Sequence, residues 1–447
     1  MKIKFIGLKV GAKLSLVSFL FISLPLYAAA KPIVNIQTWQ TNNGAHVYFV
    51  NAPQIPMVDV QIVFAAGSAY DGKAWGLASF VNSMLNEGTT TENANQIADA
   101  LDSVGAQVAG DVDGDKATVS LRSLTASKYL TPALNTFTDI VTRPSFPETA
   151  FQRVKNQTLA AIQQSYQQPS TIAAQAFYHA LYRDEPYGHP SLGTLNRIKA
   201  LTRAEVTSFY QKYYVGSNAN VIIVGDVSKD QANTVAEQVI GSLPRGEHAP
   251  MFDKAKYTEK SGYQFIQFPA KQNTIILGQV GITHQNPQYF PLTIGNHILG
   301  GLPLASILFD QVRNQRGLVY DIQSQLVPLQ YRGPFAIAFQ SRSDKASDAL
   351  QLVQKILHNY VKNGPTKSEV EDAKQNLLGS FPLKIDTNSD IVANVSNIAF
   401  YRLPLDYLDT YRDRVKAVTP DQIKKAFQNE IHPDKMKIVV VGLKNNK

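Results

Sequence analysis

The sequence predicts an α+β fold built from two homologous domains. Runs of alternating apolar residues, typical of strands, occur in both halves of the chain at 58–64, 118–124 and 274–280. Stretches with the periodicity of helices lie between and around them at 94–104, 146–168 and 346–363. The chain also resembles itself at a spacing of about half its length. Mixed elements and this repeat together indicate two layered domains of the same kind.

The repeat is clearest near the end of each half. Leu201–Val206 and Val418–Ile423 have the same offset, 217 residues, and each precedes a predicted helix and then an apolar strand. A second match pairs Lys155–Leu159 with Lys374–Leu378 at an offset of 219. A period of this length is far longer than that of a solenoid repeat. We therefore expect domains at 31–240 and 263–447, joined by a polar linker at 241–262 that contains proline and glycine.

The first 30 residues have the features of a secretory signal. Four lysines precede an apolar core at Leu14–Leu26, and Ala28–Ala30 offers a cleavage site of small residues. We expect the mature chain to begin near Lys31 and to be periplasmic or secreted. The apolar run is too short to favour stable membrane insertion, although an uncleaved anchor is the alternative.

Amino-acid composition further narrows the possible functions of the protein. The chain contains no cysteine, which excludes disulfides, thiolate chemistry and a cysteine-linked lipid. The precursor has a net charge of +8, and loss of the four signal lysines leaves +4. No basic stripe with interleaved aromatic residues is present, so the sequence predicts no nucleic-acid binding. A mature chain of about 417 residues is long enough for two cores.

The most informative segment is Gly76–Thr89, a predicted helix. Two zinc ligands on one helix must lie about four residues apart to share a face. Ser79 and Ser83 have this spacing, but a neutral hydroxyl is a poor zinc ligand. Asn82 cannot take a proton from a metal-bound water as a carboxylate does. No two of the eight histidines lie within five residues of each other, so no paired-histidine site replaces them.

This segment resembles the first active-site helix of the pitrilysin-like, or mitochondrial-processing-peptidase-like, metallopeptidases. In that family Gly-Leu-Ala and Met-Leu-x-x-Gly-Thr bracket an inverted His-x-x-Glu-His motif, whose five positions correspond here to residues 79–83. The family's third zinc ligand is a glutamate in a Leu-Glu-Glu-Ile-like stretch. The matching residues here are Leu159–Ile162, with Ala160 and Ala161 in place of the glutamates. The resemblance thus implies a zinc site whose ligands have been lost from two helices.

Further motifs extend the resemblance over nearly the whole mature chain. Pro186–Pro190 matches a family-like turn, and Leu299–Tyr320 matches a stretch of the second domain. The resemblance implies that each domain is a mainly antiparallel sheet backed by helices and that the two domains close like a clam. We interpret His189, which lies within this turn, as a purely structural residue.

Part of the family's catalytic machinery is retained. In two-subunit members, the subunit without zinc contributes an arginine and a tyrosine from an Arg-Gly-Leu-x-Tyr segment, which Arg316 and Tyr320 match. A guanidinium and a phenol can hold a peptide carbonyl and stabilise the oxyanion formed during hydrolysis. The alternative is an ordinary turn into a strand, in which Gly317 allows the backbone geometry, Leu318 packs inside and Arg316 pairs with an acid such as Asp310.

Gly300 and Gly301 resemble the family's glycine-rich substrate loop. Pro303 departs from the more flexible family pattern. A plain turn at the entry of a helix is therefore the alternative interpretation.

Together these features predict a zinc-free subunit of a heteromeric periplasmic metallopeptidase. It would carry no cofactor itself, pair with a homologous zinc-bearing subunit, bind extended or unfolded peptides, and be inactive alone. The first alternative is a non-enzymatic homodimeric or scaffold protein that retains the peptidase fold. The second is an active peptidase with an unfamiliar metal site.

Overall fold

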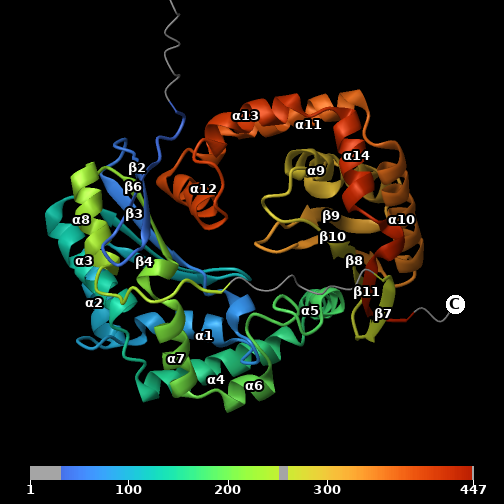
Figure 1. Ribbon diagram of the computed structural model, residues 1–447. Coiled ribbons are helices and arrows are strands. Elements are labelled where there is room, and N and C mark those ends of the chain that lie inside the picture. Colours follow the sequence, from blue (N-terminus) through green and yellow to red (C-terminus); the bar gives the residue numbers. More distant parts are fainter. Residues whose placement is uncertain (1–31, 251–259, 445–447) are drawn as a thin grey trace, which may run out of the picture. The chain divides into compact units, whose positions relative to one another are not determined.

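The computed structural model describes residues 32–250 and 260–444 (Figure 1). The predicted signal segment 1–30 and residues 251–259 of the predicted linker lie outside the described residues. In the part of the chain that the structure describes, no helix combines the length and the apolar character needed to cross a membrane.

The first half forms a six-stranded sheet in the order β1-β2-β6-β3-β5-β4. Only the β2–β6 pair is parallel. Its strands are β1 (Gln37–Gln40), β2 (His46–Asn51), β3 (Met57–Phe64), β4 (Gln107–Val112), β5 (Ala117–Leu124) and β6 (Ala219–Gly225). The helices of this half are α1 (Leu77–Met84), α2 (Ala94–Ser103), α3 (Ser127–Thr142), α4 (Glu148–Ser165), α5 (Pro169–Tyr182), α6 (Leu195–Ala200), α7 (Arg203–Tyr213) and α8 (Lys229–Ile240).

The second half forms a five-stranded sheet in the order β7-β11-β8-β10-β9. Only the β7–β11 pair is parallel. Its strands are β7 (Gly262–Gln267), β8 (Gln272–Val280), β9 (Val319–Leu326), β10 (Pro334–Arg342) and β11 (Lys437–Gly442). Its helices are α9 (Tyr289–Asn296), α10 (Ala346–Asn363), α11 (Lys367–Ser380), α12 (Asn388–Phe400), α13 (Tyr407–Ala417) and α14 (Pro420–Glu430).

The two sheets confirm the predicted α+β fold with mainly antiparallel strands. When β1 is left out, the strand orders β2-β6-β3-β5-β4 and β7-β11-β8-β10-β9 correspond one to one. In this correspondence β4 and β9 are the matching edge strands. The predicted strands at 58–64, 118–124 and 274–280 coincide with β3, β5 and β8 to within two residues.

The repeated sequence near the end of each half is a helix start. Thr202 caps α7 by accepting a hydrogen bond from the backbone N–H of Glu205, whose carboxylate accepts from the N–H of Thr202. Thr419 and Gln422 form the same capping box at the start of α14. Such a reciprocal pair satisfies two backbone donors that a helix leaves free at its beginning. The offset of 217 residues therefore marks equivalent helices.

Each sheet is covered on one face by a helix from the other half of the chain (Figure 1). On α5, Ala173, Phe177 and Leu181 pack against apolar residues of β8 and β11. On α12, Val392, Val395 and Ile398 pack against β2, β3 and β6. Since α5 and α12 occupy equivalent places in the repeat, the exchange is reciprocal. It explains why both faces of the central strands are apolar.

The described part of the predicted linker is not a free polar segment. Leu243 and Ala249 are buried in the core of the first half. The backbone carbonyls of Pro244 and Arg245 accept hydrogen bonds from Gly216 and Ser217. Two apolar side chains and these backbone bonds hold residues 241–250 against the first sheet's helices and loops.

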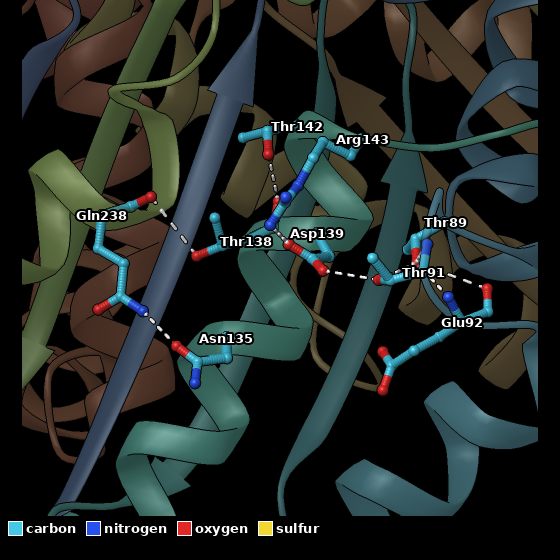
Figure 2. A network of polar contacts seen from close by, with 9 residues as sticks. All are labelled: Thr89, Thr91, Glu92, Asn135, Thr138, Asp139, Thr142, Arg143 and Gln238. Atoms are coloured by element: carbon cyan, nitrogen blue, oxygen red, sulfur yellow. Dashed lines mark hydrogen bonds and ion pairs between the residues drawn. The ribbon is translucent and has the colours of Figure 1, made fainter.

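Polar contacts hold α3 between α8 and the chain that follows α1 (Figure 2). The amide of Gln238 on α8 donates to Asn135 over 2.9 Å. On the other side the hydroxyl of Thr91 donates to the carboxylate of Asp139 over 3.0 Å, and Asp139 also pairs with Arg143. These bonds fix the segment that leaves α1.

Candidate functional site

The degenerate zinc helix is α1, and it begins through an unusual capping arrangement. Gly76, the residue before the helix, has φ of +95°, and a Cβ at this position would lie 2.6 Å from the carbonyl oxygen of Leu192. Glycine is therefore required by both conformation and space. The capping acceptor is Asp71, whose two carboxylate oxygens accept 2.7 Å hydrogen bonds from the backbone N–H groups of Gly76 and Ala78.

Asp71 is buried, with only 4% of its surface exposed. Burial raises the pKa of this carboxyl to about 7, although the two N–H donors and the charge of Arg197 act in the opposite direction. His189 lies beside it, with Nδ1 4.0 Å from a carboxylate oxygen. The His189 ring stacks on Trp75 at 5.4 Å between centroids. The burial of the Asp71 carboxyl was not predicted from the sequence. The pattern that could have indicated it is an aspartate a few residues before a glycine at the start of a helix.

Ser79 and Ser83 lie on the side of α1 that is turned away from the core. Ser79 is half-buried and Ser83 is exposed. The Ser83 hydroxyl donates to the backbone carbonyl of Ser79 over 2.8 Å, so it is engaged within the helix. Leu77, Phe80, Val81 and Met84 are all buried, as the helical spacing predicts.

Asn82 points instead into the sheet. It is 8% exposed, and its amide nitrogen donates to the carbonyl of Thr118 on β5 over 3.1 Å. A Cβ added at Gly110 on β4 would lie only 2.2 Å from the amide oxygen of Asn82. The amide therefore occupies the space that Gly110 leaves open between α1 and the edge of the sheet.

Ala160 and Ala161 lie on α4, which packs against α1 through the rings of Phe151 and Phe80 at 5.3 Å between centroids. Both alanines are exposed. They provide no donor atom, and the hydroxyls of α1 are poor ligands for a divalent zinc ion. In the described residues, no group of three or more histidine, cysteine, aspartate or glutamate side chains is placed to hold a metal ion. The residues at this place do not fit a catalytic zinc.

Arg316 lies in the turn that leads into β9, the edge strand of the second sheet, and Tyr320 is the second residue of that strand. Gly317 has φ of +60°, the left-handed conformation that the turn requires. Tyr320 is 77% exposed, and the guanidinium of Arg313 lies 5.4 Å from its ring centroid. A large aromatic side chain this exposed, at an edge strand, is available to a ligand or another chain.

The guanidinium of Arg316 is exposed and donates to the backbone carbonyl of Gln311 over 2.7 Å. The alternative pairing with Asp310 is wrong, since the carboxylate of Asp310 accepts from Gln315 instead. In the part of the chain that the structure describes, no carboxylate forms an ion pair with Arg316. No hydrogen bond or ring contact there joins Arg316 or Tyr320 to the degenerate positions on α1 and α4.

Gly300 and Gly301 end a π-helical segment, η4 (His297–Gly301), that continues from α9. A Cβ at Gly300 would lie 2.6 Å from the hydroxyl of Ser324 on β9. The glycines close a helix and pack it against β9, and a turn at 302–306 follows them and leads into the next helical segment. Leu304, shortly after them, is 68% exposed with φ of +64°.

A second buried acid, Asp115, joins the two halves and was also missed. It lies in the β4–β5 turn and is fully buried. Its carboxylate accepts hydrogen bonds from the hydroxyls of Tyr187 and Tyr401 and from the backbone N–H of Gln330. Burial raises the pKa of Asp115 and also the pKa values of both tyrosines. No spacing in the sequence reveals such a contact, since its members are far apart.

Comparison with known proteins identifies this arrangement. The family profile described as Insulinase (Peptidase family M16) matches residues 46–195, and the profile Peptidase M16 inactive domain matches residues 200–377. A crystal structure of a peptidase M16 inactive domain from Pseudomonas fluorescens is 38% identical and superposes with a TM-score of 0.89. The alignment covers 92% of this chain and 98% of that one. The chain belongs to the M16 peptidase family.

Other proteins similar to this chain differ in how they are described. A protein of Rickettsia bellii described as an uncharacterized zinc protease is 29% identical over 76% of this chain and 81% of its own length. A protein of Helicobacter pylori described as the non-peptidase homolog YmxG is 25% identical over 87% of this chain and 90% of its own. The profile match and the superposed crystal structure thus support an inactive, pitrilysin-like member of the M16 family.

Proposed function

We propose that this M16 protein is the zinc-free subunit of a heteromeric periplasmic metallopeptidase and supplies Arg316 and Tyr320 to the active site of a zinc-bearing homologous partner. The observation that carries the proposal is an asymmetry between two places in the chain. On α1 and α4 every position that would bind zinc is occupied by a hydroxyl or a methyl group. At the start of β9 an arginine and a tyrosine remain exposed, and no carboxylate of the described chain pairs with the arginine.

The two retained side chains have the chemistry that the partner's reaction needs. When water attacks a peptide carbonyl, negative charge develops on the carbonyl oxygen. A guanidinium and a phenol donate hydrogen bonds to that oxygen and stabilise the charge without breaking a bond themselves. Zinc in the partner would activate the water, and this chain would carry no cofactor.

Extended or unfolded peptides would bind by adding a strand to a sheet. Of the matching edge strands β4 and β9, β4 is the better candidate for this strand addition. It pairs only with β5, and it lies beside α1. Ala109 has a small side chain and Gly110 has none, so no bulky side chain at these two positions of β4 obstructs the edge. Backbone hydrogen bonds along an edge strand give affinity with little dependence on peptide sequence.

The test uses the full chain alone and in complex with a zinc-bearing homologue from the same organism. We expect the isolated chain to show no hydrolysis of unfolded casein with added zinc, and the complex to be active. Arg316→Ala should lower kcat of the complex about 100-fold or more, the size typical of losing an oxyanion donor. Arg412→Ala, which changes an exposed arginine on α13, is the matched control and should leave kcat unchanged.

Two outcomes would contradict the proposal. Hydrolysis by the isolated chain at a rate unaffected by Arg316→Ala would indicate an active peptidase with another metal site. A stable homodimer that binds peptides, and that no zinc-bearing homologue activates or joins, would instead support the scaffold alternative. Size-exclusion chromatography of each variant shows whether a loss of activity reflects loss of the complex.

A further inference from the structure

Two adjoining cavities form a groove near the end of α12. The larger is about 750 Å³ in volume and the smaller about 520 Å³, and both are lined by His46, Tyr48 and Arg402. We call their combined space the Arg402 groove. Each of the two cavities, taken alone, falls within the size range of small-molecule sites. It involves none of Arg316, Tyr320 or the degenerate positions on α1 and α4.

The charged side chains that line the Arg402 groove are all basic or potentially basic. His46, His248 and Arg402 share it, and His284 lines the larger cavity. In the described parts of the chain, neither cavity is lined by an aspartate or a glutamate. Burial lowers the pKa of His46, and the charges of Arg402 and His248 lower it further.

The buried acid that contacts the lining of the groove is not available to neutralise this charge. The carboxylate of Asp115 already accepts hydrogen bonds from the lining residues Tyr401 and Gln330 and from Tyr187. In the described residues no carboxylate forms an ion pair with Arg402. A guanidinium without a carboxylate partner, in a concave site, is a binding group for an oxyanion.

The backbone of Arg402 belongs to the end of α12. Its φ of +52° is the left-handed conformation common just after a helix, and the N–H of Leu403 closes the helix by donating to the carbonyl of Ile398. The guanidinium Nη2 lies 3.4 Å from Nε2 of His248, while Nδ1 of His248 lies 2.8 Å from the carbonyl oxygen of Ala249. With its proton on Nδ1, the imidazole accepts from the arginine and orients it.

Aromatic groups lie next to the basic ones. Tyr48 lines both cavities, and Trp39 lines the smaller. Ring faces of this type pack against the carbon skeleton of an organic ligand, while the guanidinium of Arg402 holds its charge.

We propose that the Arg402 groove binds a small organic oxyanion, with Arg402 as the principal ligand, His46 and His248 beside it, and Tyr48 against the organic part. A carboxylate and a phosphate share the chemistry that this arrangement recognises. The site is independent of the peptide-handling role proposed above.

The experiment is isothermal titration calorimetry of the full mature chain with defined probes. Citrate represents carboxylates, pyrophosphate represents phosphates, and glucose is the neutral probe. An acetylated tripeptide with a free carboxyl terminus, compared with its amide, distinguishes a peptide end as the source of the carboxylate. We expect at least one oxyanion probe to bind and glucose not to bind.

Variants identify the binding groups. Arg402→Gln should weaken binding about tenfold or more, because it removes a charge-assisted hydrogen bond. His46→Gln, at an exposed position of β2, should weaken binding several-fold, and Arg412→Gln should leave it unchanged. Thermal unfolding without ligand shows that each variant is folded. Absence of binding by every oxyanion probe at millimolar concentration, or equal affinity of Arg402→Gln and the unaltered chain, would overturn the proposal.

Discussion

The phenol of Tyr401 donates a hydrogen bond of 3.0 Å to the carboxylate of Asp115, which lies 286 positions earlier in the chain. Tyr401 follows α12, a helix of the second half that covers the first sheet. Asp115 lies in the turn between β4 and β5, the strands at the edge of that sheet. The bond therefore connects two places in the molecule. One is the sheet edge at which we expect peptides to bind, and the other is the end of α12, the helix that joins the two halves.

We expect Tyr401→Phe to lower the free energy of unfolding by about 1–3 kcal/mol, because a buried carboxylate loses one of its donors. Urea unfolding followed by circular dichroism measures the change. Tyr263→Phe is the control, since Tyr263 is 63% exposed and should be without effect. Equal stability of Tyr401→Phe and the unaltered protein would show that the hydrogen bonds from Tyr187 and Gln330 alone are enough to stabilise the buried carboxylate of Asp115.

Asp71 should give the protein a distinctive dependence on pH. Its pKa is raised by burial from 3.8 to about 7 in the folded state. Between these values the folded chain binds the proton more readily than the unfolded chain, so the stability contributed by this group falls as the pH rises. Across that range the loss amounts to up to about 4 kcal/mol.

Asp71→Asn tests this dependence. The variant loses one hydrogen-bond acceptor at the start of α1, about 1 kcal/mol at every pH. Its unfolding free energy should nevertheless decline less than that of the unaltered protein between pH 4 and pH 7, as measured by urea unfolding at each pH. Asp99→Asn, an exposed change on α2, should follow the unaltered profile. Parallel profiles for Asp71→Asn and the unaltered chain would refute the assignment.

Phe177 tests the exchange of helices between the halves. Its ring is 1% exposed and packs over the backbone of Gly278 on β8, where an added Cβ would lie 2.8 Å from it. We expect Phe177→Ala to cost about 3–5 kcal/mol through lost burial and the cavity left behind. Hydrogen exchange should become faster in β8 and β11, although the residue belongs to the first half. Tyr166→Ala, at a 43% exposed position, should have little effect on either measurement.

The zinc site should be recoverable by substitution, because the fold around it is retained. We expect Ser79→His and Ser83→His, combined with glutamate at position 160 or at position 161, to retain an equivalent of zinc, measured by elemental analysis after dialysis. The two histidines without a glutamate should bind zinc far more weakly. Hydrolysis of peptides should require Asn82→Glu in addition, since the site otherwise lacks a general base. A folded three-ligand variant that holds no zinc would show that the geometry of α1 and α4 has also changed.

Much of the local structure could be predicted from residue patterns. The strands β3, β5 and β8 and the helices α2 and α10 follow from alternation and helical periodicity within single segments. The capping boxes at Thr202 and Thr419 are likewise encoded in four consecutive residues each. The absence of zinc ligands at residues 79, 83, 160 and 161 is also a property of the sequence, because chemistry depends on residue type before it depends on geometry.

What only the tertiary structure decided are relationships between distant residues. The reciprocal covering of the sheets by α5 and α12 could not be predicted, since an apolar helix face does not specify which sheet it covers. The same holds for Asp115, whose burial and three donors arise where a turn, a loop and a helix end meet. The sequence by itself thus determined the elements, the repeat and the loss of the metal ligands. The structure decided their partners, because burial and hydrogen bonding depend on which surfaces meet in space.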